Sequence, residues 1–447
     1  MDSFYRRAFR VAVPVAIHSL IISAINMADV FMVGQLGEVA IAALGISNQL
    51  MFLFILLLFG MGSGGQIFIS QFFGKKDFPN LHRVMGIMII PAVILSLIVC
   101  SGALFIPHIL MSVFSKDAEV LSFSTSYLKT VGLSYPFAAI SFIYQIVLRS
   151  TDKPNVPMFT SFCTLIVNIT LNWLLIFGNL GFPQMGIEGA AVATLIARIM
   201  ETIFTLGVVY LTGAAAAAKL RNMFDFNRLL IKRVFKTSLP VFINEASWSS
   251  GIVALNIIFA QLGTESIAAI NIMESFGRIT FAGIIGIAHA GGVILGQDIG
   301  AGKESEVWDN SKKFSKLAIL IGLITSLILF SAAHPVILIY NISDNVAQMA
   351  LKTIMVWVVI LPIVSFNCLN IVGILRCGGD TKAALWIDIG GLWMIGVPLA
   401  LFGAFYLGLP IFGVYSLAKI EEVFKFIIGM HRYLSKKWIR NLVDDIS

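Results

Sequence analysis

Charged residues are scarce in this chain. Aspartate, glutamate, lysine and arginine make up 12% of its 447 residues, whereas soluble globular domains contain about 25%. Hydrophobic residues make up 58%, and they form runs long enough to cross a membrane, separated by short polar stretches. The scarcity of charge excludes an ordinary soluble protein, and the long runs predict an all-α polytopic membrane protein.

We expect twelve transmembrane helices. Alternating segments of about ten residues, which are typical of transmembrane β-barrels, do not occur in the sequence. The expected spans are 11–34, 41–72, 84–106, 120–148, 156–178, 187–211, 235–261, 267–297, 314–336, 347–375, 383–405 and 410–432.

Signals for catalysis and nucleotide use are also missing. The four cysteines have no paired spacing, so they indicate neither a disulfide nor a metal site. The sequence contains no phosphate-binding GxxxxGK[ST] loop, no histidine–cysteine metal cluster and no Ser–His–Asp arrangement. We therefore expect no enzyme and no cofactor, so the energy for uphill transport would come from an ion gradient.

Positive charge gathers at every second end of the predicted spans. The net charge is +7, and basic residues run from Arg6, Arg7 and Arg10 at the start to Arg440 near the end, while the intervening boundaries hold almost none. By the positive-inside rule both termini are cytoplasmic, and the first apolar run is a retained helix. The basic balance thus reflects topology, predicts no nucleic-acid partner, and suits a plasma membrane such as the bacterial inner membrane.

The two halves of the chain repeat each other. QLGEVAIAAL at Gln35–Leu44 recurs as QLGTESIAAI at Gln261–Ile270, with six of ten positions identical. The same offset along the chain also pairs Pro14 with Pro240. Because six spans return the chain to the same side, the repeats are parallel, which is an architecture of secondary transporters with a cavity between two halves.

The repeat predicts two pseudo-symmetric six-helix lobes. They comprise residues 1–212 and 233–447, joined by a cytoplasmic linker at 213–232. Pro14 and Pro240 each remove a backbone hydrogen bond near the inner end of the first helix of a lobe. We expect these prolines to be hinges.

One acidic residue lies deep in the first predicted span. A carboxylate at Asp29 costs several kcal/mol unless it is paired, hydrated or protonated, and the alternative is a boundary carboxylate among the outer headgroups. Asn168 and Asn172 share one face of their helix, and Thr194 adds an oxygen from the next span. Such amides often only hold helices together, but with Asp29 they suit a hard cation such as Na⁺, or a protonatable carboxylate.

Glu245 is a second acidic residue inside an apolar span, and its own helix offers no basic residue within one turn. Trp248 lies three residues further on the same face. An acid beside an aromatic ring suits an organic cation through Coulomb attraction and cation–π contact. We expect Glu245 to bind the coupling cation and the substrate, with Trp248 as a substrate contact.

Three further polar residues are candidates for a substrate site. Glu274 lies four residues before Arg278, so the two either form an intrahelical ion pair or line a site. Asn48 takes the place of Glu274 in the first repeat, and Asp388 lies deep enough in its span to face a cavity.

Several motifs together resemble those of the multidrug and toxic compound extrusion (MATE) family of cation-coupled antiporters. They are DVFMVGQLG at Asp29–Gly37, IAALGIS at Ile41–Ser47, GIEGAAVAT at Gly186–Thr194 and LRCGGDTK at Leu375–Lys382. None is diagnostic alone, but their order in a twelve-span double repeat is specific.

The resemblance implies a cation site made of the Asp29 acid, Asn168, Asn172 and Thr194. It also implies roles for Glu245 and Glu274. Members of the DinF-like branch carry an aspartate where this chain has Asn172, so the chain resembles the NorM-like branch. Several members of the family carry an acidic residue in their tenth transmembrane helix. This chain has no acid at the matching position, and Asn367 of the tenth expected span lies near it.

The expected function is Na⁺- or H⁺-coupled efflux of cationic amphiphilic compounds by alternating access. Asn48 and Glu274 would form one layer of the pathway, with Trp248, Tyr144 and Phe276 near the cavity. The partners would be small organic substrates and membrane lipids, and the protein would be a monomer. The alternatives are a lipid-linked oligosaccharide flippase of the same superfamily, which would need basic residues in its cavity, and a non-transporting receptor or scaffold.

Overall fold

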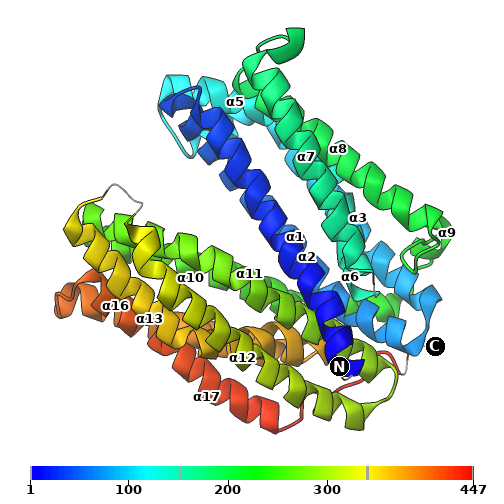
Figure 1. The fold of residues 1–447 in the computed structure, drawn as a ribbon. Coiled ribbons are helices and arrows are strands. Elements are labelled where there is room, and N and C mark those ends of the chain that lie inside the picture. The colour runs from blue at the N-terminus through cyan, green and yellow to red at the C-terminus, as the bar shows by residue number, and fades with distance from the viewer. Residues whose placement is uncertain (1–2, 152, 339–341, 445, 447) are drawn as a thin grey trace. The chain divides into compact units, whose positions relative to one another are not determined.

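A computed structural model describes residues 3–151, 153–338, 342–444 and 446, and all regular structure within them is helical (Figure 1). The elements, with η for short 3-10 and π segments, are α1 (Ser3–Gly34), α2 (Glu38–Lys75), α3 (Phe78–Phe105), α4 (Pro107–Ser112), α5 (Ala118–Gly132), α6 (Tyr135–Ser150), α7 (Asn155–Phe177), η1 (Asn179–Gly181), α8 (Ile187–Leu211), α9 (Leu220–Met223), α10 (Arg228–Ala260), α11 (Thr264–Gly300), α12 (Glu304–Ile337), α13 (Asp344–Cys368), η2 (Leu369–Leu375), α14 (Thr381–Gly391), η3 (Leu392–Gly396), α15 (Val397–Leu401), η4 (Phe402–Tyr406), α16 (Ile411–Ala418) and α17 (Ile420–Leu434).

Within the described residues, ten helical segments are long and apolar enough to cross a membrane. The predicted span 120–148 is a bent pair, α5 and α6, with an angle of 53°. Pro136 lies in the first turn of α6, where its missing N–H prevents the preceding helix from continuing straight.

The predicted span 410–432 is likewise interrupted. It consists of α16 and α17, which meet at Lys419. There the Glu422 N–H bonds to the Lys419 carbonyl, a 3-10 step that breaks the α-helical ladder. The twelve predicted spans thus correspond to ten continuous segments, one bent pair and one interrupted pair.

The chain forms two compact units. The N-terminal unit consists of Ile17–Ile69 and Asp77–Phe235, and the C-terminal unit of Met1–Ala16, Ser70–Lys76 and Lys236–Ser447. The start of α1 therefore packs with the second half of the sequence, which differs from the predicted lobe limits. Two contacts hold the start of α1 in this unit. Arg7 pairs with Asp298 at 2.8 Å. Gly286 packs against Ala12 so closely that a Cβ on Gly286 would lie 2.7 Å from the Ala12 carbonyl oxygen.

Residues 213–232, predicted as an inter-lobe linker, are part of the N-terminal unit. Asp225 forms an ion pair with Arg83 of α3. Met223 lies against Gly86, where a Cβ would come within 2.0 Å of the Met223 carbonyl oxygen. Two of the four borders between the units fall inside α1, just after Pro14, and inside α10, shortly before Pro240; the other two enclose Ser70–Lys76 at the end of α2.

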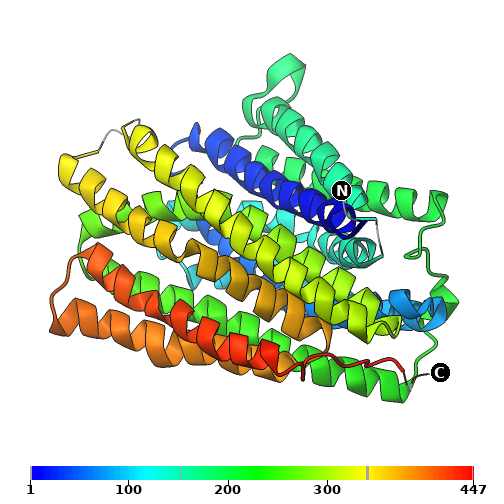
Figure 2. The same ribbon diagram turned by 60° about the horizontal axis from the view of Figure 1, so that its bottom comes forward.

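Close helix packing places the polar residues of each unit. In the N-terminal unit, Gly189 of α8 approaches the backbone of α7 so closely that a Cβ would lie 2.6 Å from the Leu175 carbonyl oxygen. This approach brings the polar face of α7 next to Thr194. In the C-terminal unit, α17 lies alongside α13 and α14 (Figures 1 and 2).

Candidate functional site

Asp29 is joined to the polar face of α7. The Asn172 amide nitrogen donates hydrogen bonds to Asp29 Oδ1 at 2.6 Å and to Asn168 Oδ1 at 3.2 Å. Both asparagines are buried, and Asp29 is half-buried. Their shared helical face, which the four-residue spacing predicted, therefore does point at the carboxylate.

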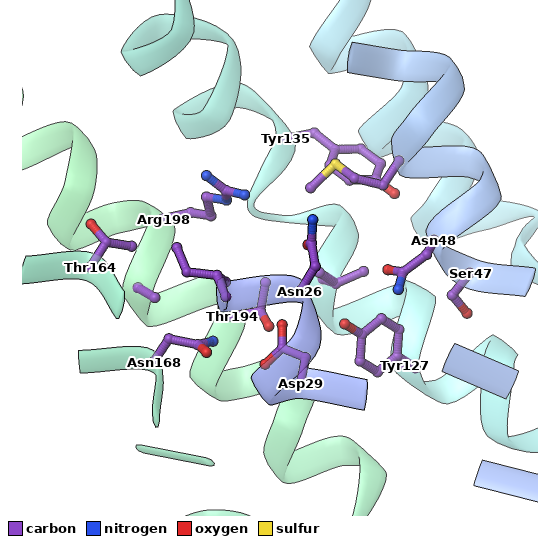
Figure 3. A pocket seen from close by; sticks show the side chains of 14 residues that line it. Asn26, Asp29, Ser47, Asn48, Tyr127, Tyr135, Thr164, Asn168, Thr194 and Arg198 are labelled. Carbon is purple, nitrogen blue, oxygen red and sulfur yellow. The ribbon is translucent and has the colours of Figure 1, made fainter. Parts of the chain in front are cut away.

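A small cavity surrounds this cluster in the N-terminal unit. Its volume is about 50 Å³, which is enough for a few water molecules or an ion but far below the 300–1,000 Å³ of a drug-sized site. The Asp29 carboxylate lies between the side chains of Asn168, Thr194 and Tyr127 (Figure 3). The lining residues are Ile25, Asn26, Asp29, Ser47, Asn48, Met51, Tyr127, Val131, Tyr135, Thr164, Asn168, Thr194, Ala197 and Arg198.

Two buried oxygens near Asp29 are poorly satisfied. Asn172 Oδ1 has no hydrogen-bond partner among the described residues, and Thr194 Oγ1 makes only a weak contact with the Tyr127 hydroxyl. A buried polar atom without a partner is costly, so it indicates a site for water or an ion. Asp29, Asn168 and Thr194 all line the cavity, and carboxylate, amide and hydroxyl oxygens are the donors that hard cations prefer.

Several cavity residues were not foreseen from the sequence. Asn26 precedes Asp29 by one helical turn, and that spacing was a usable signal. Tyr127 and Tyr135 come from the bent pair α5–α6, whose geometry no local pattern reveals. Asn48, which the sequence marked as a substrate-site candidate, lines the Asp29 cavity.

Arg198 lines the same cavity but does not neutralise Asp29. It pairs at 2.8 Å with Glu201, three residues further along α8. Glu201 also accepts hydrogen bonds from Gln145 and Ser161, each at 3.1 Å. The charges of Arg198 and Glu201 are thus largely balanced within this group, and the amide of Asn172 remains the donor closest to Asp29.

Glu245 has a basic partner that lies far away in the sequence. Arg376, directly after η2, lies 2.8 Å from the Glu245 carboxylate, and both side chains are largely buried. The helix of Glu245 offers no neutralising base, as the sequence indicated, but a distant part of the chain supplies one. Trp248 is 41% exposed, so it remains accessible beside the pair.

Asp388 is also engaged, in a larger buried cluster. It lies 2.8 Å from the Lys425 ammonium and accepts a hydrogen bond of 2.8 Å from Asn244. Lys425 lies near Glu421 and Glu422 as well. Asp388, expected from the sequence to lie deep enough to face a cavity, is thus held by Lys425 and Asn244.

The remaining candidates lie outside the Asp29 cavity. Glu274 pairs with Arg278 at 3.8 Å, as one of the two sequence interpretations proposed. Phe276 packs, half-buried, against the apolar core of the C-terminal unit. The buried Tyr144 hydroxyl is hydrogen-bonded to the Tyr210 hydroxyl at 3.0 Å.

The protein-family model MatE matches residues 14–174 and 240–402, which is more than half of the chain. The chain belongs to the MATE family. The two matched segments begin at Pro14 and Pro240, the same two prolines that the internal repeat pairs. The MATE resemblance of the sequence motifs is thereby confirmed, and the protein is a multi-pass membrane transporter, not an enzyme.

Curated relatives align with this MATE chain over most of its length. A Thermotoga maritima protein named "Probable multidrug resistance protein NorM" is 23% identical over 450 residues, which cover 98% of this chain and 94% of the relative. A Staphylococcus saprophyticus protein named "Multidrug export protein MepA" is 25% identical, and the alignment covers 84% of this chain and 81% of the relative.

Solved MATE structures share the fold. A structure titled "Crystal structure of MATE in the bent conformation" superposes with a TM-score of 0.87 at 20% identity, covering 98% of this chain and 97% of that one. A Vibrio cholerae MATE transporter gives a TM-score of 0.88 at 17% identity, covering 98% and 99%. The predicted all-helical membrane fold with two lobes is confirmed.

Proposed function

We propose that this MATE transporter is a multidrug efflux antiporter that exchanges organic, mostly cationic amphiphilic compounds for Na⁺ or H⁺. Its bacterial relatives carry the names multidrug resistance and multidrug export protein. The observation that supports ion coupling is the small Asp29 cavity, which the half-buried Asp29 carboxylate lines together with Asn168 and Thr194.

In this mechanism the ion and the drug occupy different places. The Asp29 cavity holds an ion or a few waters but no drug-sized molecule. The two ligands therefore compete through conformation, because each favours the state that it binds more tightly. Na⁺ or H⁺ entering from outside neutralises Asp29 and favours drug release, and loss of the ion inside restores the state that takes up the next drug.

The membrane setting follows from the same proposal. The basic residues at alternate helix ends support cytoplasmic termini by the positive-inside rule, and the relatives are bacterial. We propose a location in the bacterial inner membrane, where the protein works as a monomer among lipids. Arg376 and Lys425 are buried bases, but each is paired with a carboxylate, so they do not favour a pyrophosphate-binding flippase.

The test is drug efflux from proteoliposomes with an imposed gradient. Ethidium transport should depend on a Na⁺ or a pH gradient in the wild type, and Asp29→Asn should abolish that dependence. Transport by Asp29→Asn that follows the gradient as in the wild type would contradict the site assignment. Absence of gradient-dependent flux in the wild type would favour a receptor or scaffold.

A further inference from the structure

Lys425 is a buried lysine surrounded by carboxylates in the C-terminal unit. Its side chain is 4% exposed, and its ammonium lies 2.8 Å from Asp388, 3.4 Å from Glu421 and 3.7 Å from Glu422. Asp388 comes from α14 and the two glutamates from α17. Three acidic groups from two helices thus converge on one fixed positive charge.

The surroundings are shaped for this lysine. A Cβ at Gly391 would lie 2.6 Å from Lys425 Cε and 2.7 Å from its Cγ, so the glycine leaves the space that the lysine stem fills. Two asparagine side chains also donate hydrogen bonds to these carboxylates. Asn244 donates to Asp388, and Asn367 donates to Glu422, both at 2.8 Å.

Such a set of carboxylates cannot stay charged in an apolar interior without cations. An exchangeable Na⁺ or proton is one source of positive charge, and an ammonium that is covalently attached is another. The ammonium is a compact point charge with three N–H donors, and three carboxylates surround it. Unlike an ion, it cannot leave the site.

We propose that Lys425 is a tethered cation that takes the place of an exchangeable coupling ion in the C-terminal unit. The ion pair between Glu245 and Arg376 acts in the same sense, because it neutralises the other acid that the sequence assigned to ion binding. This inference rests on the proposed ion coupling at Asp29. It deepens that proposal by leaving Asp29 as the one exchangeable site, and it predicts a single coupling ion per transport cycle.

The charge count of the cluster indicates what removal of the lysine would do. Asp388, Glu421 and Glu422 face two bases, Lys419 and Lys425, while Glu245 is balanced by Arg376. One negative charge is in excess when all groups are ionised, and loss of Lys425 would double that excess. The cluster should then recruit a cation from solution.

The experiment counts exchangeable cations per chain on the purified, detergent-solubilised full-length protein. Radioactive Na⁺ binding and proton uptake are measured in parallel in the Asp29→Asn background, where the first site is silenced. With Lys425 present, we expect no exchangeable cation that depends on Asp388. With Lys425→Met added, we expect a gain of about one cation per chain, which is lost again with Asp388→Asn, whereas Lys425→Arg should gain none.

Two results would overturn the inference. One is the binding of an Asp388-dependent cation by the Asp29→Asn protein that still carries Lys425. This measurement does not depend on whether a Lys425 variant folds. The other is a folded Lys425→Met protein that gains neither Na⁺ nor a proton. If Asp29→Asn itself leaves ion-driven transport unchanged, the proposed function fails, which is a separate and distinguishable outcome.

Discussion

Arg376 and Glu245 form an ion pair of 2.8 Å although they lie far apart in the sequence, and their side chains are only 5% and 16% exposed. The arginine follows the π-helical segment η2, and the glutamate lies in α10. π-helical segments are rare and often occur at functional sites. The pair links α10 to the end of the α13–η2 span inside the C-terminal unit.

We expect this pair to support the stability of the C-terminal unit. Arg376→Gln leaves an uncompensated buried carboxylate and should destabilise the protein by about 3 kcal/mol. Glu245→Gln should do the same for the arginine, whereas the double variant should recover part of the loss. Thermal unfolding followed by size-exclusion chromatography measures the effect, and additive single losses would show that the pair contributes no coupling energy.

The cation site makes a prediction about Asp29. Asp29→Asn removes the only carboxylate among the residues that line the cavity, so gradient-driven ethidium efflux should fall to the level of empty liposomes. Asp309→Asn is a matched control, because Asp309 is an exposed acid paired with Lys312 at 2.7 Å. Equal losses in both variants would mean that the effect is not specific to the cavity.

Thr194→Val separates ion binding from stability. The Thr194 hydroxyl lines the Asp29 cavity and makes only a weak contact with the Tyr127 hydroxyl, so its removal should cost little stability while weakening cation binding several-fold. Thr202→Val is the control in the same helix, because that hydroxyl bonds to the Phe137 and Arg198 carbonyls at 3.0 and 2.9 Å. It should lower the unfolding temperature and leave ion affinity unchanged; the opposite pattern would contradict the role of Thr194.

The hinge prediction concerns rate rather than stability. Pro14 and Pro240 lie close to the borders between the two compact units. Restoring a backbone N–H with Pro14→Ala or Pro240→Ala should slow drug exchange about tenfold or more, without weakening ion binding, because helix bending becomes harder. Pro91→Ala, in the middle of α3, should transport at the wild-type rate; equal slowing by all three would argue against a specific hinge.

Much of this protein is determined by its sequence alone. Long apolar runs require helices in a membrane, since no other open structure satisfies the backbone there. The internal repeat predicted two related halves, and the Asn168–Asn172 spacing predicted one polar face. These features are local or periodic, so a linear reading detects them.

The tertiary structure decided which charges meet. Nothing near Glu245 in the sequence indicates Arg376, and nothing near Asp388 indicates Lys425, because each partner comes from a distant helix. It also placed the start of α1 in the C-terminal unit and Tyr127 beside Asp29. A buried charge is neutralised by whichever helix packs against it, and that choice depends on the packing of the whole bundle rather than on any spacing along the chain.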